Sequence, residues 1–317
     1  MAIEKFYSAE EWLARFPASS PPTALAIGNF DGVHLGHQQI LRRVAEHGRP
    51  EKCLAAVLTF YPHPTRVLRP SEAPPLLMTL DQRLRAIEAM GIDAALVARF
   101  DAEFARISAE DFVRRFVHQT MRAKFVAVGA NFRFGHRQAG DVSTLKELGG
   151  QSGFDVESIA PVVVEGVTVS STAIRKYLRE GQVEEAARML GRAYALEGEV
   201  RPGTGIGRKL VVPTLNLSTQ QELLPKAGVY ATEVSVNGGN YRAATNVGVR
   251  PTFDGAHVTI ESHLLDFSEE LTTGAMTVRF LARLRDEMKF SGPEALRQQI
   301  LSDIEQVKKY FLAARKS

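Results

Sequence analysis

Cysteine is almost absent from this chain, which has one, Cys53, in 317 residues. A single cysteine excludes a framework of intrachain disulfides and is typical of a reducing compartment. We expect a buried core thiol, because Cys53 opens the apolar stretch CLAAVLTF. The chain also lacks any apolar run near the ~20 residues of a membrane span and any secretory signal pattern. We therefore expect a cytoplasmic protein with no membrane partner.

Runs of positive charge are missing as well. Lys and Arg number 39 against 36 Asp and Glu, a formal net charge of +3, and they are scattered along the chain. This balance argues against a nucleic-acid partner and suits small anionic ligands such as phosphates. The sequence leaves the oligomeric state open.

A Gly-Lys pair is absent too, which excludes the GxxxxGK[ST] phosphate loop. The glycine-rich stretch GTGIGRKL contains Gly203, Gly207 and Arg208, and its backbone N–H groups could still bind phosphates. A hairpin turn explains the same stretch equally well.

Short apolar runs alternate with amphipathic stretches from Thr23 to about Gly181. The runs ALAIG, CLAAVLTF, DAALVARF and KFVAVG are typical of strands covered on both faces. Helix starts are predicted in the segments between these runs, at Thr79 with Gln82 and at Ser108 with Asp111. Strands that alternate with helices predict a parallel, doubly wound α/β sheet.

Beyond Tyr194 the pattern changes to the period of two that predicts antiparallel strands, with a hairpin signal in NGGN at Asn237 to Asn240. We expect an antiparallel β-barrel, followed by an amphipathic helix over 293–314 that packs against it. The length suits two domains, and we place them at residues 1–186 and 187–317.

The stretch GNFDGVHLGH places His34 and His37 on the first turn of an expected helix, directly after a strand. Helix N-termini bind anions, and the carboxyl ends of parallel strands are where doubly wound folds bind ligands. Gly36, between the histidines, lets a ligand approach the backbone. Imidazole N–H groups there suit a growing negative charge on a phosphate. A metal pair or a capping role are the alternatives.

The stretch VSSTAIR predicts a second helix start, in which Ser170, Ser171 and Thr172 can cap the helix and Arg175 lies in its first turn. A cation at that end opposes the helix dipole and favours an anionic partner. A plain cap with a solvated arginine is the alternative. Together, the two stretches favour a polyphosphate bound between two helix N-termini.

These motifs, with TFYPHP and GANFRFGHRQAGD in the same order and spacing, resemble the bifunctional prokaryotic riboflavin kinase/FAD synthetases. The stretches PTLN and IESHLLDF resemble the kinase half of that family, so the resemblance covers nearly the whole chain. It implies a Rossmann-like FMN adenylyltransferase domain and a riboflavin kinase barrel. The implied reactions phosphorylate riboflavin to FMN and then join FMN to the AMP part of ATP, giving FAD and pyrophosphate. ATP and Mg²⁺ are implied with them.

In the first half the resemblance implies catalytic roles for His34, His37 and Arg175 at the ATP phosphates. It implies flavin contacts by Asn131 and by a flap that contains Pro62 and Pro64. The other implied ATP or phosphate contacts are Gly28, Phe30, Asp31, Gly36, Ser171 and Thr172.

In the second half the resemblance implies that Thr214 and Asn216 hold Mg²⁺ and that Glu261 is the base for the riboflavin 5′-hydroxyl. It implies a flavin contact by Arg285. It also implies phosphate contacts by Gly203, Gly207 and Arg208.

The chain departs from the family at Thr168, where a basic residue is frequent, at Val211 and Val212, where Gly-Phe is usual, and at Thr272. A β-branched residue cannot keep the backbone freedom of glycine. An adenylyltransferase with a flavin-binding but weakened kinase domain is therefore the alternative function. A non-catalytic flavin or nucleic-acid module fits poorly with so many reactive residues. A class I aminoacyl-tRNA synthetase is disfavoured because the chain has no Lys-Met-Ser-Lys-Ser loop.

Overall fold

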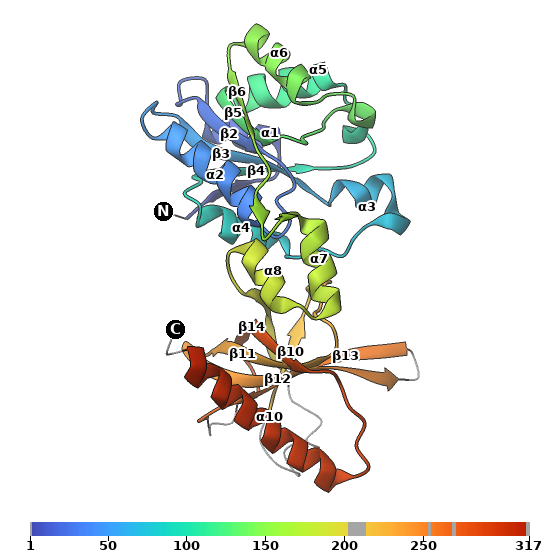
Figure 1. Ribbon diagram of the computed structural model, residues 1–317. Coiled ribbons are helices and arrows are strands. Elements are labelled where there is room, and N and C mark those ends of the chain that lie inside the picture. Colours follow the sequence, from blue (N-terminus) through green and yellow to red (C-terminus); the bar gives the residue numbers. More distant parts are fainter. Residues whose placement is uncertain (1, 202–213, 253–254, 268–270, 315–317) are drawn as a thin grey trace. The chain divides into compact units, whose positions relative to one another are not determined.

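The protein is described by a computed structural model that covers residues 2–201, 214–252, 255–267 and 271–314 (Figure 1). Its chain divides into two compact units, Met1–Ser171 and Thr172–Ser317. We call them the front unit and the barrel unit. The expected functional boundary at 186/187 stays a prediction.

The front unit is built on a six-stranded parallel sheet with the order β1-β4-β3-β2-β5-β6. The strands are β1 (Glu4–Phe6), β2 (Thr23–Ile27), β3 (Leu54–Tyr61), β4 (Ala94–Arg99), β5 (Ala123–Gly129) and β6 (Asp155–Ile159). The predicted doubly wound sheet is confirmed. The sequence did not predict the edge strands β1 and β6, which are short and partly polar.

The strand order reverses beside β2. The chain runs from β2 to β3 and β4 on one side, and then places β5 and β6 on the other side. In doubly wound sheets the crevice at such a reversal, outside the carboxyl ends of the strands, is where ligands bind. The segments that follow β2 and β5 are therefore the first places to look for a site.

Helices cover both faces of this sheet. One core contains buried residues of α1 (Ala9–Arg15), of α5 (Ala109–Phe112) with the π-helical segment η3 (Val113–Thr120) that continues it, and of α6 (Val142–Ser152). The other core contains residues of α2 (Leu35–Gly48) and α4 (Leu80–Glu88). Strand β2 serves both, because Leu25 and Ile27 enter the first core and Ala24 and Ala26 enter the second.

Shorter elements complete the front unit. They are α3 (Pro64–Leu68), η1 (Pro70–Glu72), η2 (Phe104–Arg106), η4 (His136–Gln138) and the hairpin β7 (Val163–Val164) and β8 (Val167–Thr168). The predicted helix starts are confirmed, since Thr79 and Gln82 form a capping box and the Ser108 side chain accepts from the Asp111 amide. Each cap satisfies backbone donors that the first helical turn leaves unpaired.

The barrel unit is a closed six-stranded antiparallel barrel with the order β10-β13-β12-β11-β14-β9. Its elements are α7 (Ser171–Glu180), α8 (Val183–Leu190), β9 (Tyr194–Arg201), β10 (Leu215–Thr219), β11 (Gly228–Val236), β12 (Gly239–Thr252), β13 (Gly255–Leu264), β14 (Ala275–Arg285) and α10 (Pro293–Ala314). The predicted hairpin is confirmed: Asn237 and Gly238, with φ of 48° and 79°, form its two-residue turn.

Three buried hydroxyl groups run across neighbouring strands of the barrel. Thr232 Oγ1 lies 2.7 Å from Thr245 Oγ1, which lies 2.8 Å from Ser262 Oγ. All three side chains have no exposed surface. Successive side chains of a strand point to opposite faces of the sheet. The residues on either side of Asn216, Asn246 and Glu261 are buried, so these three side chains lie on the outer face of the barrel.

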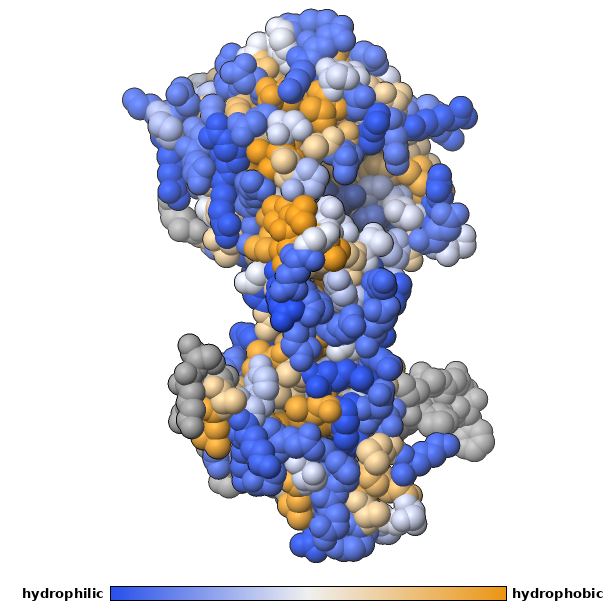
Figure 2. All heavy atoms as spheres, viewed as in Figure 1, coloured by the Kyte–Doolittle hydropathy of each residue, from blue (hydrophilic) through white to orange (hydrophobic). Residues whose placement is uncertain are grey.

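Helix α10 covers part of the outer face, as predicted, with Ile304, Val307 and Phe311 buried against Ala231 and Ala282. In the view of Figure 2 the surface is mostly hydrophilic, with smaller hydrophobic patches. In the described ranges we find no helix with the length and apolarity that a membrane crossing requires.

Helices α7 and α8 are bonded to the barrel. The Lys226 amide donates to the Leu178 carbonyl at 2.9 Å, and the Arg283 amide donates to Glu184 Oε1 at 3.2 Å. Gly181 has a φ of +81°, and a Cβ built there would lie only 2.6 Å from Arg283 Cδ. This position therefore requires glycine both for its backbone and for the space that Arg283 occupies.

The core of the front unit allows a matched test on α1. Trp12 is 1% exposed, whereas its neighbour Leu13 is 43% exposed. We expect Trp12→Ala to lower the free energy of unfolding of the front unit by about 3–5 kcal/mol. We expect Leu13→Ala to change it by less than about 0.5 kcal/mol. Urea unfolding of the full chain, followed by circular dichroism, measures both, and equal effects would contradict this assignment of the core.

Candidate functional site

The turn between β2 and α2 has an unusual backbone. Phe30 and Val33 have φ of 51° and 40°, in the left-handed region, and each is 1% exposed. A β-branched residue in that region is strained, and strain of this kind persists where the surroundings fix it, often at functional sites. Gly28 accommodates the Phe30 ring, because a Cβ there would lie 3.2 Å from Phe30 Cζ.

Asp31 fixes this turn from within. Its carboxylate is 2% exposed and accepts hydrogen bonds from the Leu77 amide, at 3.1 Å to each oxygen, and from the Met78 amide at 3.3 Å. Gln38 adds a bond from Nε2 to the Val33 carbonyl at 3.0 Å. The structure thus gives Asp31 a positioning role, and the predicted phosphate contact stays a prediction.

His34 is the N-cap of α2. Its Nδ1 accepts a hydrogen bond from the His37 amide at 3.3 Å, so the proton of the neutral ring lies on Nε2 and makes that atom a donor. The capping alternative therefore holds, and it prepares the ring to donate to an anion. Gly36 is needed beside it, since a Cβ there would lie 3.3 Å from His34 Cε1.

His37 lies face to face with His34. The ring centroids are 3.6 Å apart with an interplanar angle of 16°, and the Phe30 ring meets His37 edge-on at 5.3 Å. Burial, followed by the charges of His34 and Arg83, holds the pKa of His37 well below its ordinary value of 6.5. At neutral pH His37 is therefore an uncharged imidazole, stacked on His34 at the positive end of a helix.

Arg83, on α4, is a residue that the sequence analysis missed. It has no exposed surface, and its Nη1 donates to the Asn29 carbonyl at 2.9 Å. Helical spacing could have found it, because Arg83 shares the i, i+3, i+4, i+7 stripe with Leu80, Leu84 and Ile87. Arg85, two residues later, lies off that stripe and is exposed.

The start of α7 reaches the same turn. Ser171 Oγ donates to the Asp31 carbonyl at 2.9 Å, so its hydroxyl is engaged by the turn that precedes His34. Thr172 is exposed, whereas Arg175 is only 6% exposed. That these three side chains bind a polyphosphate stays a prediction.

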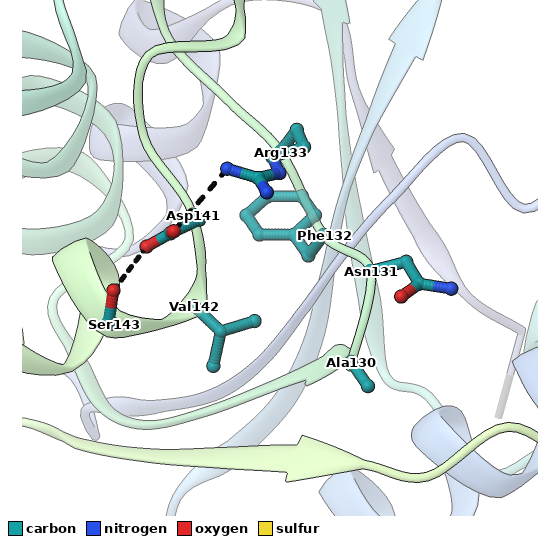
Figure 3. A pocket seen from close by; sticks show the side chains of 7 residues that line it. All are labelled: Ala130, Asn131, Phe132, Arg133, Asp141, Val142 and Ser143. Carbon is teal, nitrogen blue, oxygen red and sulfur yellow. Dashed lines mark hydrogen bonds and ion pairs between the residues drawn. The ribbon is translucent and has the colours of Figure 1, made fainter.

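A pocket of about 310 Å³ opens at the carboxyl end of β5 (Figure 3). In the sheet, β5 neighbours β2 on the side opposite β3. Its lining is Ala130, Asn131, Phe132, Arg133, Asp141, Val142 and Ser143. Asn131, a predicted flavin contact, is exposed at its rim. The pocket thus combines an amide, an aromatic ring and a pair of opposite charges, which suits a polar aromatic ligand.

Asp141 organises one wall of this pocket as the N-cap of α6. It accepts from Ser143 Oγ at 2.5 Å and from the Thr144 amide at 3.0 Å, and it faces Arg133 Nη1 at 3.3 Å (Figure 3). The Ser143 hydroxyl, the Thr144 backbone amide and the Thr144 hydroxyl, and then Arg133, lower the pKa of Asp141 to about 2. The carboxylate is therefore ionised at any physiological pH.

The predicted flap prolines follow β3. Tyr61–Pro62 is a cis peptide bond, and Pro64 is the first residue of α3, whose N-cap is His63. The segment thus leaves the carboxyl end of β3, a neighbour of β2 in the sheet. Its contact with a flavin stays a prediction.

In the barrel unit, the register brings predicted site residues together. Asn216 on β10 is directly opposite Glu261 on β13, and Glu261 is directly opposite Asn246 on β12. Directly opposed side chains share a face of the sheet, with Cβ atoms about 4.5–5.5 Å apart. Thr214 immediately precedes β10 and is half-buried. Asn246, which sequence reasoning did not select as a site residue, completes this polar row.

This row is a set of hard oxygen donors that fits Mg²⁺. The described residues contain no group of three or more His, Cys, Asp or Glu side chains placed to hold a metal ion. Mg²⁺ usually takes one or two carboxylates and completes its shell with waters and substrate phosphates. The Asn216 amide oxygen and the Thr214 hydroxyl, with the Glu261 carboxylate on the neighbouring strand, match that incomplete protein shell.

The other predicted contacts of the second half remain untested by the structure. Arg285 forms a bidentate ion pair with Asp303 of α10, at 2.8 Å from Nε and 2.7 Å from Nη2, and this pairing leaves its predicted flavin contact untested. Gly203, Gly207 and Arg208 lie outside the described residues, as do Val211 and Val212.

Comparison with known proteins covers both units. Residues 16–173 match the family model for FAD synthetase, and residues 190–311 match the model for riboflavin kinase. Two similar proteins are both named bifunctional riboflavin kinase/FMN adenylyltransferase. The one from Buchnera aphidicola (subspecies Schizaphis graminum) is 36% identical, covering 91% of this chain and 94% of that protein. The one from Escherichia coli K12 is 35% identical, covering 90% and 92%.

A solved structure has a similar fold. The crystal structure described as a macrolide-efflux protein from Streptococcus pneumoniae matches with a TM-score of 0.86 and 27% identity. The match covers 97% of this chain and 99% of that one. The architecture is therefore shared along nearly the whole length.

The low pKa of His37 makes the stability of the front unit depend on pH. As the pH falls below 6.5, the unfolded chain binds a proton at His37 while the folded chain does not, so stability falls. The slope from one such group is at most about 1.4 kcal/mol per pH unit. We expect thermal unfolding of His37→Gln to change less between about pH 7 and pH 5 than that of the wild type. Equal slopes would show that His37 titrates normally in the folded protein.

Proposed function

The chain belongs to the family of bifunctional riboflavin kinase/FMN adenylyltransferases, and we propose how its residues divide the two reactions between the two halves. The protein phosphorylates riboflavin to FMN with ATP and then adenylylates FMN to FAD, releasing pyrophosphate. The observation that carries the assignment is the stacked His34–His37 pair at the N-terminus of α2, beside the strand-order reversal.

We propose that the front half carries out adenylyl transfer. The phosphate of FMN attacks the α-phosphorus of ATP in line, and pyrophosphate leaves, so the protein has to position both groups and offset the growing negative charge. His34 Nε2–H and the amides of the first turn of α2 supply fixed donors for that charge. Arg175 and the Ser171–Thr172 helix start hold the pyrophosphate portion. Gly28, Phe30, Asp31 and Gly36 shape the turn.

The flavin of FMN is assigned to the pocket after β5. Asn131 offers amide groups to the polar edge of the flavin, and Phe132 offers an aromatic surface. The segment with Pro62 and Pro64 closes over the flavin from the end of β3. These positions flank β2, the strand that precedes His34.

The barrel is assigned to the kinase reaction. Glu261 orients the riboflavin 5′-hydroxyl and takes its proton as the hydroxyl attacks the γ-phosphorus of ATP and ADP leaves. Thr214 and Asn216 hold Mg²⁺, which neutralises phosphate charge when it is bound. Gly203, Gly207 and Arg208 contact phosphates, and Arg285, with Asp303, orders the flavin side of the site. Asn246 orients Glu261 from the neighbouring strand.

The wider setting follows from this chemistry. We propose that the enzyme acts in the cytoplasm on riboflavin, FMN and ATP, with Mg²⁺ as cofactor and without nucleic-acid or membrane partners. We also propose that the functional domains are residues 1–186 and 187–317. In that division α7 and the first turn of α8 serve adenylyl transfer.

Separate substitutions test the division of labour. His37→Ala should lower FAD formation from FMN by about 10²–10³-fold, because it removes part of the charge-stabilising helix start. It should leave FMN formation from riboflavin unchanged. Glu261→Gln should lower FMN formation by about 10²–10⁴-fold and leave FAD formation from FMN unchanged. Chromatography of products over time measures both, and loss of both activities from one folded variant would refute the assignment.

The metal assignment is tested on β10. Asn216→Ala should raise the Mg²⁺ concentration required for half-maximal FMN formation by about tenfold or more, because one oxygen ligand is lost. Ser218→Ala, an exposed position on the same strand, is the matched control and should behave as the wild type. Chelation with EDTA should abolish FMN formation in all three proteins, and added Mg²⁺ should restore it. An unchanged Mg²⁺ requirement in Asn216→Ala would remove Asn216 from the metal shell.

A further inference from the structure

Arg83 is a buried cation without an ion-pair partner among the described residues. Its side chain has no exposed surface, and Nη1 donates to two backbone carbonyls, Asn29 at 2.9 Å and Phe60 at 3.4 Å. Its Nε and Nη2 are buried and have no hydrogen-bond partner in the part of the chain that the structure describes. Burial lowers the pKa of Arg83, although Asp31 and Tyr61 oppose that shift.

A structural role in the core does not account for such a residue. Buried charges are normally paired and their donors satisfied, and an apolar side chain of similar volume would avoid the cost of desolvation. Groups with a pKa shifted by burial cluster at functional sites. The position of Arg83 therefore points to a role in the candidate site.

The two carbonyl groups that Arg83 joins belong to the carboxyl edge of the sheet. Asn29 begins the left-handed turn after β2, and Phe60 is the penultimate residue of β3. The bonds fix the turn that leads to His34, close to the point at which the cis Tyr61–Pro62 bond leaves the sheet. The charge of Arg83 also acts on His37, the second ring of the stack.

We propose that Arg83 is a positioning residue for adenylyl transfer, which ties the ends of β2 and β3 together and supplies a fixed positive charge behind the His34–His37 stack. This inference rests on the proposed function of the front half. Together with burial and His34, the charge disfavours protonation of His37, which stays an uncharged imidazole stacked against His34. The bonds to the two carbonyls hold the turn from which His34 caps α2.

The electrostatic surroundings of His37 come from more than one element. His34, in the same turn, and Arg83, on α4, both disfavour the charged form of His37, after the larger effect of burial. Asp31 in the turn and Tyr61 at the end of β3 face Arg83 and favour its charged form. Removal of the Arg83 charge should therefore raise the pKa of His37.

Three full-length variants separate charge from shape. Arg83→Gln removes the charge, Arg83→Lys keeps it but loses the forked donors, and Arg85→Gln removes an exposed charge on the same helix. NMR titration of the His37 ring, assigned with His37→Gln, should show an upward pKa shift in Arg83→Gln only. The kcat for FAD formation from FMN should fall by about tenfold or more in Arg83→Gln and less in Arg83→Lys. Arg85→Gln should match the wild type.

The outcomes are distinct. A pKa of His37 that moves equally in Arg83→Lys and Arg83→Gln, or in neither, would overturn the proposal in favour of simple packing. If Arg83→Gln does not fold, the wild-type titration decides, because a His37 pKa at or above 6.5 would overturn the proposal too. FMN formation from riboflavin is the internal control for intact protein. Absence of FAD formation in the wild type would reject the proposed function, while the titration would still test Arg83.

Discussion

The turn between β2 and α2 is the constraint on which the front half depends. Six residues take the chain from the end of a buried strand to the cap of a helix, and two of them, Phe30 and Val33, adopt a conformation that neither side chain favours. Tertiary bonds stabilise that conformation, from Asp31 to the amides of residues 77 and 78 and from Arg83 to Asn29. Those bonds come from segments about fifty residues later, so the site exists only in the folded sheet.

The candidate sites of the two halves offer different chemical groups to a phosphate-bearing substrate. The front half offers oriented N–H dipoles and a stacked pair of imidazoles, which suit a reaction in which the attacking group is already an anion. The barrel offers oxygen atoms on the outer face of three strands, Asn216, Glu261 and Asn246, which suit a metal ion and a hydroxyl that has to lose its proton. Each chemistry thus matches the nucleophile that its reaction uses.

Much of this could be predicted from the sequence, because the decisive patterns are local. The apolar run that leads into GNFDGVHLGH predicted a strand followed by a helix start. The period of two in apolar residues beyond Tyr194 predicted the barrel strands. Other features depend on distant partners. The sequence does not show that the Leu77 and Met78 amides donate to Asp31, and it does not show that Arg83 bonds the Asn29 carbonyl. Asn246 joins the site through strand register, which residue spacing alone does not determine.

The attachment of α7 and α8 to the barrel matters for how the protein can be divided. The Leu178 carbonyl and Glu184 accept backbone amides of the barrel, and Gly181 makes room for Arg283. A recombinant fragment that starts at 187 would expose these amides and the Arg283 side chain to water. A fragment that keeps the compact unit would instead start before Thr172, and it would carry Thr172 and Arg175, which we propose for adenylyl transfer. The boundary between the compact units, at 171/172, thus differs from the functional boundary that we propose at 186/187, and an experiment that splits the gene has to choose between them.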